Sequence, residues 1–246
     1  MAGHSKWANI KHRKGAKDKK RAKVFTRIIR EIHIATKDGG PDPDGNPALR
    51  LSISNAKGAN IPKDTIVRAI KKASGADSAS YEEPTYEGYA PHGIAVFVEC
   101  TTDNLNRTIA AVRSVFTKRG GSLGTNGSLG FLFERKGIFI IPQGEMNEDD
   151  FTLEMIDGGA EEVELEDGTF MVTTAFEDFG NMMKKLEELE IEPESAELQR
   201  IPHETISLPI SDAKQALHLI ELLEEDDDVS NVFHNLELTE ELLAAE

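Results

Sequence analysis

The sequence predicts a multidomain α+β protein, with a helical bundle at the N-terminus and mixed strand and helix patterns after it. Three observations support this prediction: basic residues are concentrated in the first 72 positions, helix start and stop signals dominate that part, and strand patterns appear only beyond a small polar stretch at 76–80. The 246 residues, 39% of them apolar, are enough for two or three domains.

Charge is strongly segregated along the chain. Residues 1–72 contain 18 Lys and Arg against 6 Asp and Glu, a net charge of +12, whereas residues 73–246 contain 10 against 38, a net charge of −28. Between Lys6 and Arg30, eleven cations face one acid, Asp18. A polyanion bound near this end would gain from counterion release, and the acidic remainder would be repelled from it. The asymmetry therefore points to a nucleic-acid partner for the N-terminal part.

The first predicted helix covers residues 19–37. Apolar residues recur there at three- and four-residue spacing, as on one buried face: Val24, Phe25, Ile28, Ile29, Ile32 and Ala35. Lys20, Lys23, Arg27 and Arg30 repeat at the same spacing on the other side. Because a solvated basic tail does not need a buried face, this pattern favours a folded helix that presents a cationic stripe.

Two further helices complete the predicted bundle over residues 20–75. Asn46 and Pro47 are a typical helix start and Gly58 a typical stop, and a similar pattern runs from Pro62 to Gly75. Residues 1–20 show no helical periodicity, and we expect an arm that orders on binding. Its Trp7 is expected either to stack on a base or to pin the arm to the bundle.

The remaining sequence alternates between strand and helix patterns. The expected strands are 94–99, 129–133, 138–141, 162–165, 170–174, 196–201, 205–210 and 229–234, and the expected helices are 105–118, 147–156, 176–189 and 213–223. The order within 137–201 is β-α-β-β-α-β, that of a ferredoxin-like unit. The segments on either side together make a second such unit, so we expect one ferredoxin-like domain inserted in another. The predicted domains are 1–76, 81–134 together with 203–246, and 135–202.

No residue pattern indicates an active site. Gly120-Gly121-Ser122-Leu123-Gly124 fits G-x-S-x-G, but it follows a helix and precedes a strand, the reverse of a nucleophile elbow, which favours a glycine-rich turn. The seven His are scattered and Cys100 is the single Cys, so we expect no metal, no cofactor and no enzyme. No apolar run reaches the roughly 18 residues of a membrane helix, and we expect a cytoplasmic protein with no membrane partner.

Several sequence blocks resemble one known family. Residues 1–14, MAGHSKWANIKHRK, resemble the opening signature of the YebC/PmpR family, and 60–66 (NIPKDTI), 86–89 (YEGY), 103–108 (DNLNRT), and 121–124 with 127–128 resemble its other recurrent blocks. The resemblance runs nearly end to end. It implies a helical N-terminal domain followed by two α+β domains, with no active site. It also implies two roles, a DNA-binding transcriptional regulator in bacteria and a ribosome-associated translation factor, the latter shared with similar mitochondrial translational activators.

These observations leave three hypotheses for function. The preferred one is a DNA-binding transcriptional regulator. The alternative is a translation factor that eases elongation, in which the same cations bind ribosomal RNA. Its acidic domains would then face tRNA, nascent chain or a protein partner. A phosphate-binding stripe suits either polymer. The third, a hydrolase at Ser122, is the least favoured. The residues expected to bind nucleic acid are Lys6, Trp7, Lys11, Arg13, Lys14, Lys17, Lys20, Lys23, Arg27 and Arg30.

Overall fold

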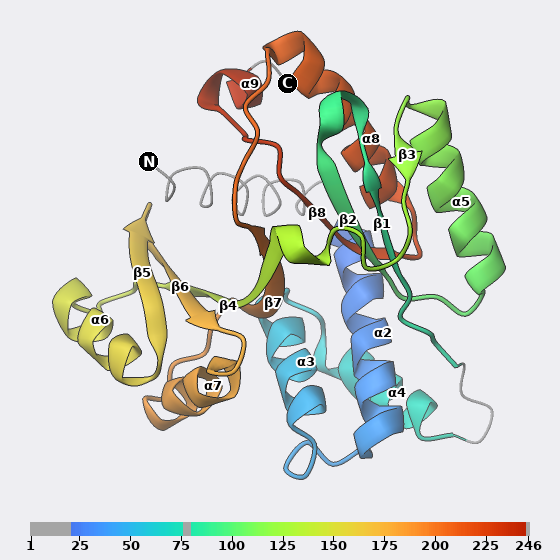
Figure 1. The fold of residues 1–246 in the computed structure, drawn as a ribbon. Helices are drawn as coiled ribbons and strands as arrows, with labels where there is room; N and C mark the ends of the chain where they lie inside the picture. The colour runs from blue at the N-terminus through green and yellow to red at the C-terminus, as the bar shows by residue number, and fades with distance from the viewer. Residues whose placement is uncertain (1–20, 76–79, 245–246) are drawn as a thin grey trace. The chain divides into compact units, whose positions relative to one another are not determined.

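The structure, a computed structural model, describes residues 21–75 and 80–244. The chain divides into two compact units: the first comprises Met1–Val24, Ala79–Glu134 and Ile201–Glu246, and the second comprises Phe25–Ser78 and Arg135–Arg200. Over the described residues there are eight α-helices and two four-stranded antiparallel sheets, one sheet in each unit (Figure 1). The predicted α+β class is therefore confirmed.

The three expected N-terminal helices are present. They are α2 (Arg21–Gly39), α3 (Pro47–Gly58) and α4 (Lys63–Ala73). Ile28 and Ile32 are buried on α2, as the periodicity predicts. The Asn46 side chain accepts a hydrogen bond from the Leu49 amide at 3.0 Å and donates one to the Ala35 carbonyl at 2.7 Å. One buried side chain thus starts α3 and satisfies a carbonyl near the end of α2.

The sheet of the second unit has the strand order β5-β6-β4-β7. Its elements are β4 (Phe133–Pro142), α6 (Glu148–Asp157), β5 (Ala160–Glu166), β6 (Thr169–Ala175), α7 (Phe179–Glu188) and β7 (Ser195–Pro202). Phe139 and Phe170 pack with Met155 of α6 and Met182 of α7, so the two helices cover one face of the sheet (Figure 1). The chain order matches the β-α-β-β-α-β pattern predicted for this segment.

The sheet of the first unit has the strand order β3-β1-β2-β8. Its elements are β1 (Thr85–Tyr89), β2 (Ala95–Cys100), α5 (Leu105–Lys118), β3 (Ser122–Leu123), α8 (Ile210–Glu225) and β8 (Val229–His234), followed by α9 (Glu240–Ala244). Val96, Phe116 and Leu219 belong to the core between this sheet and helices α5 and α8. A smaller cluster that includes Phe97 and Phe233 packs separately from that core.

The predicted strand at 129–133 is wrong. The segment forms the 3₁₀ turn η2 (Gly130–Leu132), and β4 begins only at Phe133. The reason is a buried carboxylate: Glu87, which is 4% exposed, accepts hydrogen bonds from the amides of Gly127, at 2.7 Å, and Leu129. A loop held by a side chain cannot at the same time offer these amides to a neighbouring strand.

The predicted strand at 205–210 is also wrong. Ile206 makes only an isolated parallel bridge to Leu236, and Pro209 precedes the first residue of α8. Proline has no amide hydrogen for a strand ladder and a backbone suited to a helix start. The sequence analysis missed β1, which lies between β2 and β3 in the sheet. The first unit therefore runs β-β-α-β-α-β, and the order expected for it is wrong.

Candidate nucleic-acid interface

The structure places three of the ten predicted nucleic-acid-binding residues. Lys6, Trp7, Lys11, Arg13, Lys14, Lys17 and Lys20 lie outside the residues that it describes. Lys23, Arg27 and Arg30 lie on α2, and each of the three is partly buried. The predicted cationic stripe on α2 is therefore not fully exposed to solvent.

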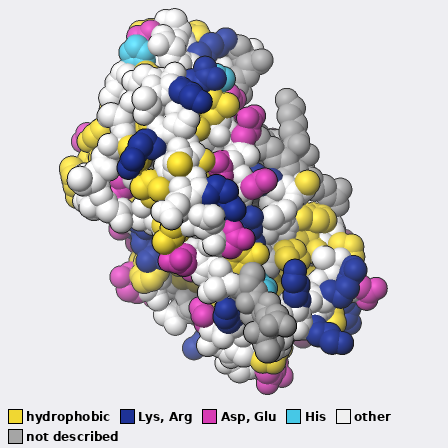
Figure 2. Space-filling view, turned by 90° about the vertical axis from the view of Figure 1, so that its right-hand side faces the viewer, with side chains coloured by type: hydrophobic (Ala, Val, Ile, Leu, Met, Phe, Trp, Pro, Cys, Tyr) yellow, Lys and Arg dark blue, Asp and Glu magenta, His cyan; other side chains and the backbone are white. Residues whose placement is uncertain are grey.

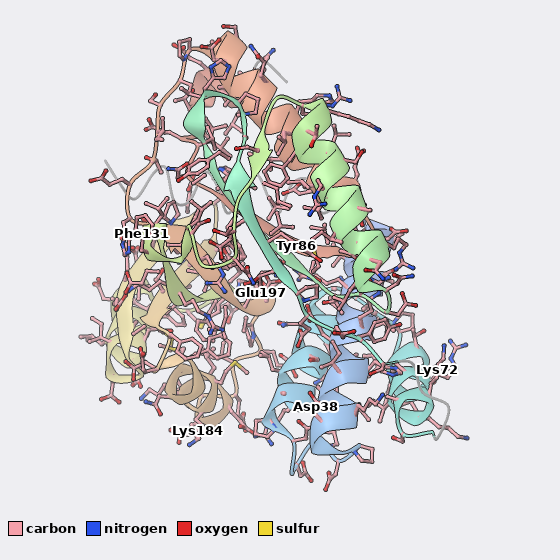
Figure 3. All side chains as sticks on the ribbon, turned by 45° about the vertical axis from the view of Figure 1, so that its right-hand side comes forward. Asp38, Lys72, Tyr86, Phe131, Lys184 and Glu197 are labelled. Atoms are coloured by element: carbon pink, nitrogen blue, oxygen red, sulfur yellow. The ribbon has the colours of Figure 1, made fainter. Side chains whose placement is uncertain are left out.

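Arg27 forms an internal ion pair. Its Nη2 lies 2.6 Å from Oε1 of Glu197 on β7, and its Nε lies 3.3 Å from Oε1 of Glu31 on the same helix. The side chains of Arg27 and Glu197 are only 12% and 15% exposed, and Figure 3 labels Glu197. A phosphate would have to displace a carboxylate from a site with little water. Arg27 thus stabilises the packing of α2 on β7 within the second unit.

Lys23, which belongs to the first unit, is also engaged. Its ammonium donates hydrogen bonds to the carbonyl oxygens of Glu224 and Asp226 at the end of α8. The carbonyls at a helix C-terminus carry partial negative charge, so a lysine is a favourable partner there. This contact competes with any phosphate for the same ammonium.

Helix α4 carries an exposed cationic surface that the sequence analysis did not single out. Lys63, Arg68, Lys71 and Lys72 are exposed, whereas Ile66, Ala69 and Ala73 are buried on the other side. Arg68 donates to the Asp64 carbonyl at 3.1 Å. Within the described ranges, Lys63, Lys71 and Lys72 have no ion-pair partner. Figure 2 shows Lys and Arg side chains gathered over α4, and Figure 3 labels Lys72.

The geometry of α4 suits contact with a phosphate backbone. Lys63, Val67 and Lys71 follow one another at four-residue spacing along the exposed side, and Val67 is 53% exposed. At 1.5 Å per residue, Lys63 and Lys71 are separated by about 12 Å along the helix axis. That span covers several phosphates of one DNA strand, which follow at about 3.4 Å along the duplex axis. The cations of this surface suit contacts with phosphate oxygens, which position a duplex without carrying sequence information.

A signal for this surface was present in the sequence. The apolar spacing after Pro62 predicts one buried side made of Ile66, Val67, Ile70 and Ala73, but the buried residues are Ile66, Ala69 and Ala73, and Val67 is 53% exposed. Counting Ala69 in place of Val67 as part of the inner face would have put Val67 among the lysines. The nucleic-acid-binding residues were instead predicted before Arg30, where the density of positive charge along the sequence is higher.

The sequence block 103–108 (DNLNRT) stabilises the fold of the first unit. Asp228 is 4% exposed, and it accepts hydrogen bonds from Arg107 Nε at 2.9 Å and from the Thr108 hydroxyl at 2.9 Å. Burial acts to raise the pKa of Asp228, but the hydrogen bonds from Arg107 and Thr108 outweigh it and lower the pKa. The block therefore ties the start of α5 to the residue before β8.

The other chemical candidates have structural roles. Ser122 begins the two-residue strand β3, and a Cβ on the neighbouring Gly121 would lie 2.6 Å from the Tyr89 carbonyl oxygen, so the glycines allow close backbone packing. Burial, followed by the nearby Asp226, raises the pKa of Cys100 to about 12. Among the residues with coordinates, no group of three or more His, Cys, Asp or Glu is arranged to hold a metal. None of the described helices has the length and apolar character to cross a membrane.

The comparisons with known proteins agree with one another. Residues 5–76 match the model of the TACO1/YebC N-terminal domain, and residues 81–236 match that of the TACO1/YebC second and third domain. A "probable transcriptional regulatory protein" of Amoebophilus asiaticus is 53% identical over 239 residues, which cover 96% of this chain and 98% of the relative. A protein of the same name from Geobacillus thermodenitrificans is 50% identical over 240 residues, which cover 96% and 97%.

A solved structure is also similar. The crystal structure of a conserved hypothetical protein from Aquifex aeolicus matches with a TM-score of 0.80 at 43% sequence identity, over 91% of this chain and 93% of that one. The α+β architecture described above is thus found in a relative of known structure. Since the family models match most of the chain and its relatives align over nearly all of it, the chain belongs to the TACO1/YebC family.

Proposed function

We propose that this chain is a DNA-binding transcriptional regulator that holds duplex DNA by its phosphates. The observation that carries the proposal is the surface of α4, where Lys63, Lys71 and Lys72 are exposed and have no ion-pair partner in the described part of the chain. The basic residues predicted before α2, from Lys6 to Lys20, would extend this interface. Each phosphate neutralised by a lysine releases condensed counterions, which favours binding.

Duplex DNA is the favoured ligand because the names of the relatives refer to transcription. A cationic helix alone would bind RNA as well, so the choice rests on those names and is open to experiment. Phosphate contacts alone carry no sequence information, so sequence preference would depend on a contact of Arg68 or a lysine of α4 with a guanine edge, or on the shape and deformability of the DNA. Such a regulator would act in the cytoplasm of a bacterium.

We also propose that the chain has three domains, 1–76, 81–134 with 203–246, and 135–202, the last of which is a ferredoxin-like insertion. The strand order β5-β6-β4-β7 and the chain order of the second unit support the ferredoxin-like assignment. The first unit gathers Ala79–Glu134 and Ile201–Glu246 around one sheet, which supports the insertion. An experimental structure of this chain would test the domain boundaries.

The test of DNA binding reverses charge on α4 alone. The variant Lys63→Glu/Lys71→Glu changes two exposed side chains that contribute nothing to the core. Glu is favourable in the first turn of a helix and unfavourable in the last, so the two changes should offset each other in stability. The control, Arg135→Glu/Lys184→Glu, makes the same charge change at two exposed positions of the acidic sheet and helix in the same unit.

Affinity for a fluorescent 30-base-pair duplex would be measured by anisotropy at several salt concentrations. We expect the α4 variant to lose about ten-fold or more in affinity, and its slope of log K against log salt to become shallower by about 1.8, from two lost phosphate contacts. The control should stay close to wild type. Equal affinities of the two variants would show that α4 is not part of the interface. If wild type binds a structured RNA more tightly than duplex DNA, RNA and not DNA is the ligand.

A further inference from the structure

Helix α5 carries cations and no acidic residue, although it lies within the acidic part of the chain. Residues 73–246 contain 38 Asp and Glu, yet none of them lies between Asp103 and Glu134. The same interval contains four cations: Arg107, Arg113, Lys118 and Arg119. Acidic residues are therefore absent from α5 and from the glycine-rich segment that follows it, although they dominate the rest of this part of the sequence.

The outer side of α5 is presented to solvent along its length. Asn106, Ala110, Arg113 and Thr117 are exposed at alternating four- and three-residue spacing, whereas Val112 and Phe116 are buried against the sheet of the first unit. Lys118 and Arg119 are exposed at its C-terminal end. Figure 2 faces the side on which α5 lies and shows Lys and Arg side chains along its upper half. The helix thus offers a positively charged surface some 20 Å long.

The other cations of α5 and its C-terminal end differ from Arg107, Lys136 and Lys185 in having no carboxylate partner in the part of the chain that the structure describes. Within the described ranges, no carboxylate pairs with Arg113, Lys118 or Arg119. By contrast Lys136 lies 2.8 Å from Glu161, and Lys185 lies 2.6 Å from Glu154. A favourable interaction with the helix dipole would account for Lys118 and Arg119 at the C-terminus, but Arg113 lies more than one turn before the end.

We infer that α5 is a second phosphate-contacting surface, which binds the backbone of the same class of ligand, duplex DNA. The inference rests on the proposed function and extends it from the second unit to the first. Charge complementarity is the argument: a polyanion gains by contacting Arg113, Lys118 and Arg119, which have no carboxylate partner in the described ranges and lie on or next to a helix that itself contains no acidic residue. Binding would then involve a helix of each unit, α4 and α5.

The experiment compares five full-length proteins: wild type, the α4 variant, the control Arg135→Glu/Lys184→Glu, and two α5 variants, the first of which is Arg113→Glu/Lys118→Glu. A neutral version, Arg113→Gln/Lys118→Gln, avoids the unfavourable effect of Glu at a helix C-terminus and is the second α5 variant. Circular dichroism and thermal melting check that each protein is folded. Affinity for duplex DNA is then measured over a range of salt concentrations.

We expect both α5 variants to bind DNA more weakly than the control, by about ten-fold for the reversal, with a salt slope shallower by about 1.8. If wild type binds and the α5 variants match the control, the inference is wrong while the proposed function stands. If the α5 variants lose binding and the α4 variant does not, α5 is a DNA-contacting surface and α4 is not. Absence of DNA binding by wild type would overturn both.

Discussion

A carboxylate from a distant part of the sequence distinguishes Arg27 and Arg107 from Lys71 and Arg113. Arg27 and Arg107 lie within hydrogen-bonding distance of Glu197 and Asp228 and contribute to the folded structure. Lys71 and Arg113 are exposed and have no acidic partner in the described residues, and they are the ones available to a phosphate. Sequence spacing shows the neighbours Glu31 and Asp103, four residues away, but not Glu197 and Asp228, which are more than 100 residues away.

This role of Asp228 leads to a prediction on stability and pH. Asp228→Asn should lower the free energy of unfolding at pH 7 by about 1.5–3 kcal/mol, since it removes the charge that Arg107 and Thr108 bind. The pKa of Asp228 is lowered in the folded protein, so this stabilisation is complete above the ordinary value of 3.8 and is lost as pH falls through the lowered pKa. Urea unfolding between pH 7 and pH 3 would show the difference shrinking with acid.

Asp103→Asn is the matched control, because Asp103 also pairs with Arg107 but is 55% exposed. Its effect should be within about 0.5 kcal/mol. If the two variants lose the same free energy of unfolding, burial of the Asp228 carboxylate contributes nothing to stability.

At the scale of elements, α3 is fixed to the sheet of the second unit through the edge strand β7. The side-chain amide of Asn55 donates to the Ala196 carbonyl at 3.0 Å and accepts from the Ala196 amide at 2.9 Å. This one side chain pairs both backbone groups of Ala196 on the free edge of β7. Close to it, a Cβ on Gly58 would lie 1.9 Å from the Glu194 carbonyl oxygen, so the helix approaches the chain there only because residue 58 is glycine.

Asn55→Leu should therefore destabilise the protein by about 2–4 kcal/mol, because it leaves a buried amide and a buried carbonyl of Ala196 without partners. Lys57→Ala, on the same helix, removes an exposed ion pair with Glu192 and should cost less than about 1 kcal/mol. Denaturant unfolding measures both, and hydrogen exchange should show faster exchange of the Ala196 amide in the Asn55 variant. An unchanged exchange rate would contradict this role.

The elements that could be predicted from the sequence are those with local signals. Asn46 and Pro47 begin α3, and the helical pattern from Leu105 matches α5, because caps and periodicity act over a few residues. The failures depend on distant contacts: the loop at 124–129 is held by Glu87, some 40 residues earlier, and β1 becomes a strand through its pairing with β2 and β3. No local pattern reports such partners.

At the scale of the whole molecule, the segregation of charge along the chain could be predicted from composition, but the surface on which the exposed cations lie could not. The +12 of residues 1–72 points to the N-terminal part, where Lys23, Arg27 and Arg30 of α2 are partly buried and the cations of α4 are exposed. In the acidic part, a net charge of −28 hid the cations of α5, a helix that contains no acidic residue. Averages over long segments suggest a class of partner, whereas burial and pairing of single side chains locate the candidate site.

The contribution of the first twenty residues can be separated from that of α4 by a double-mutant cycle. They contain seven cations, Lys6, Lys11, Arg13, Lys14, Lys17, Lys19 and Lys20, against Asp18. A chain that starts at residue 21 should bind duplex DNA more weakly, with a salt slope shallower by up to about 6 if all seven contact phosphates. If the segment and α4 bind one duplex independently, their effects on the binding free energy add in the combined variant. A truncated chain with wild-type affinity would instead confine the interface to the described helices.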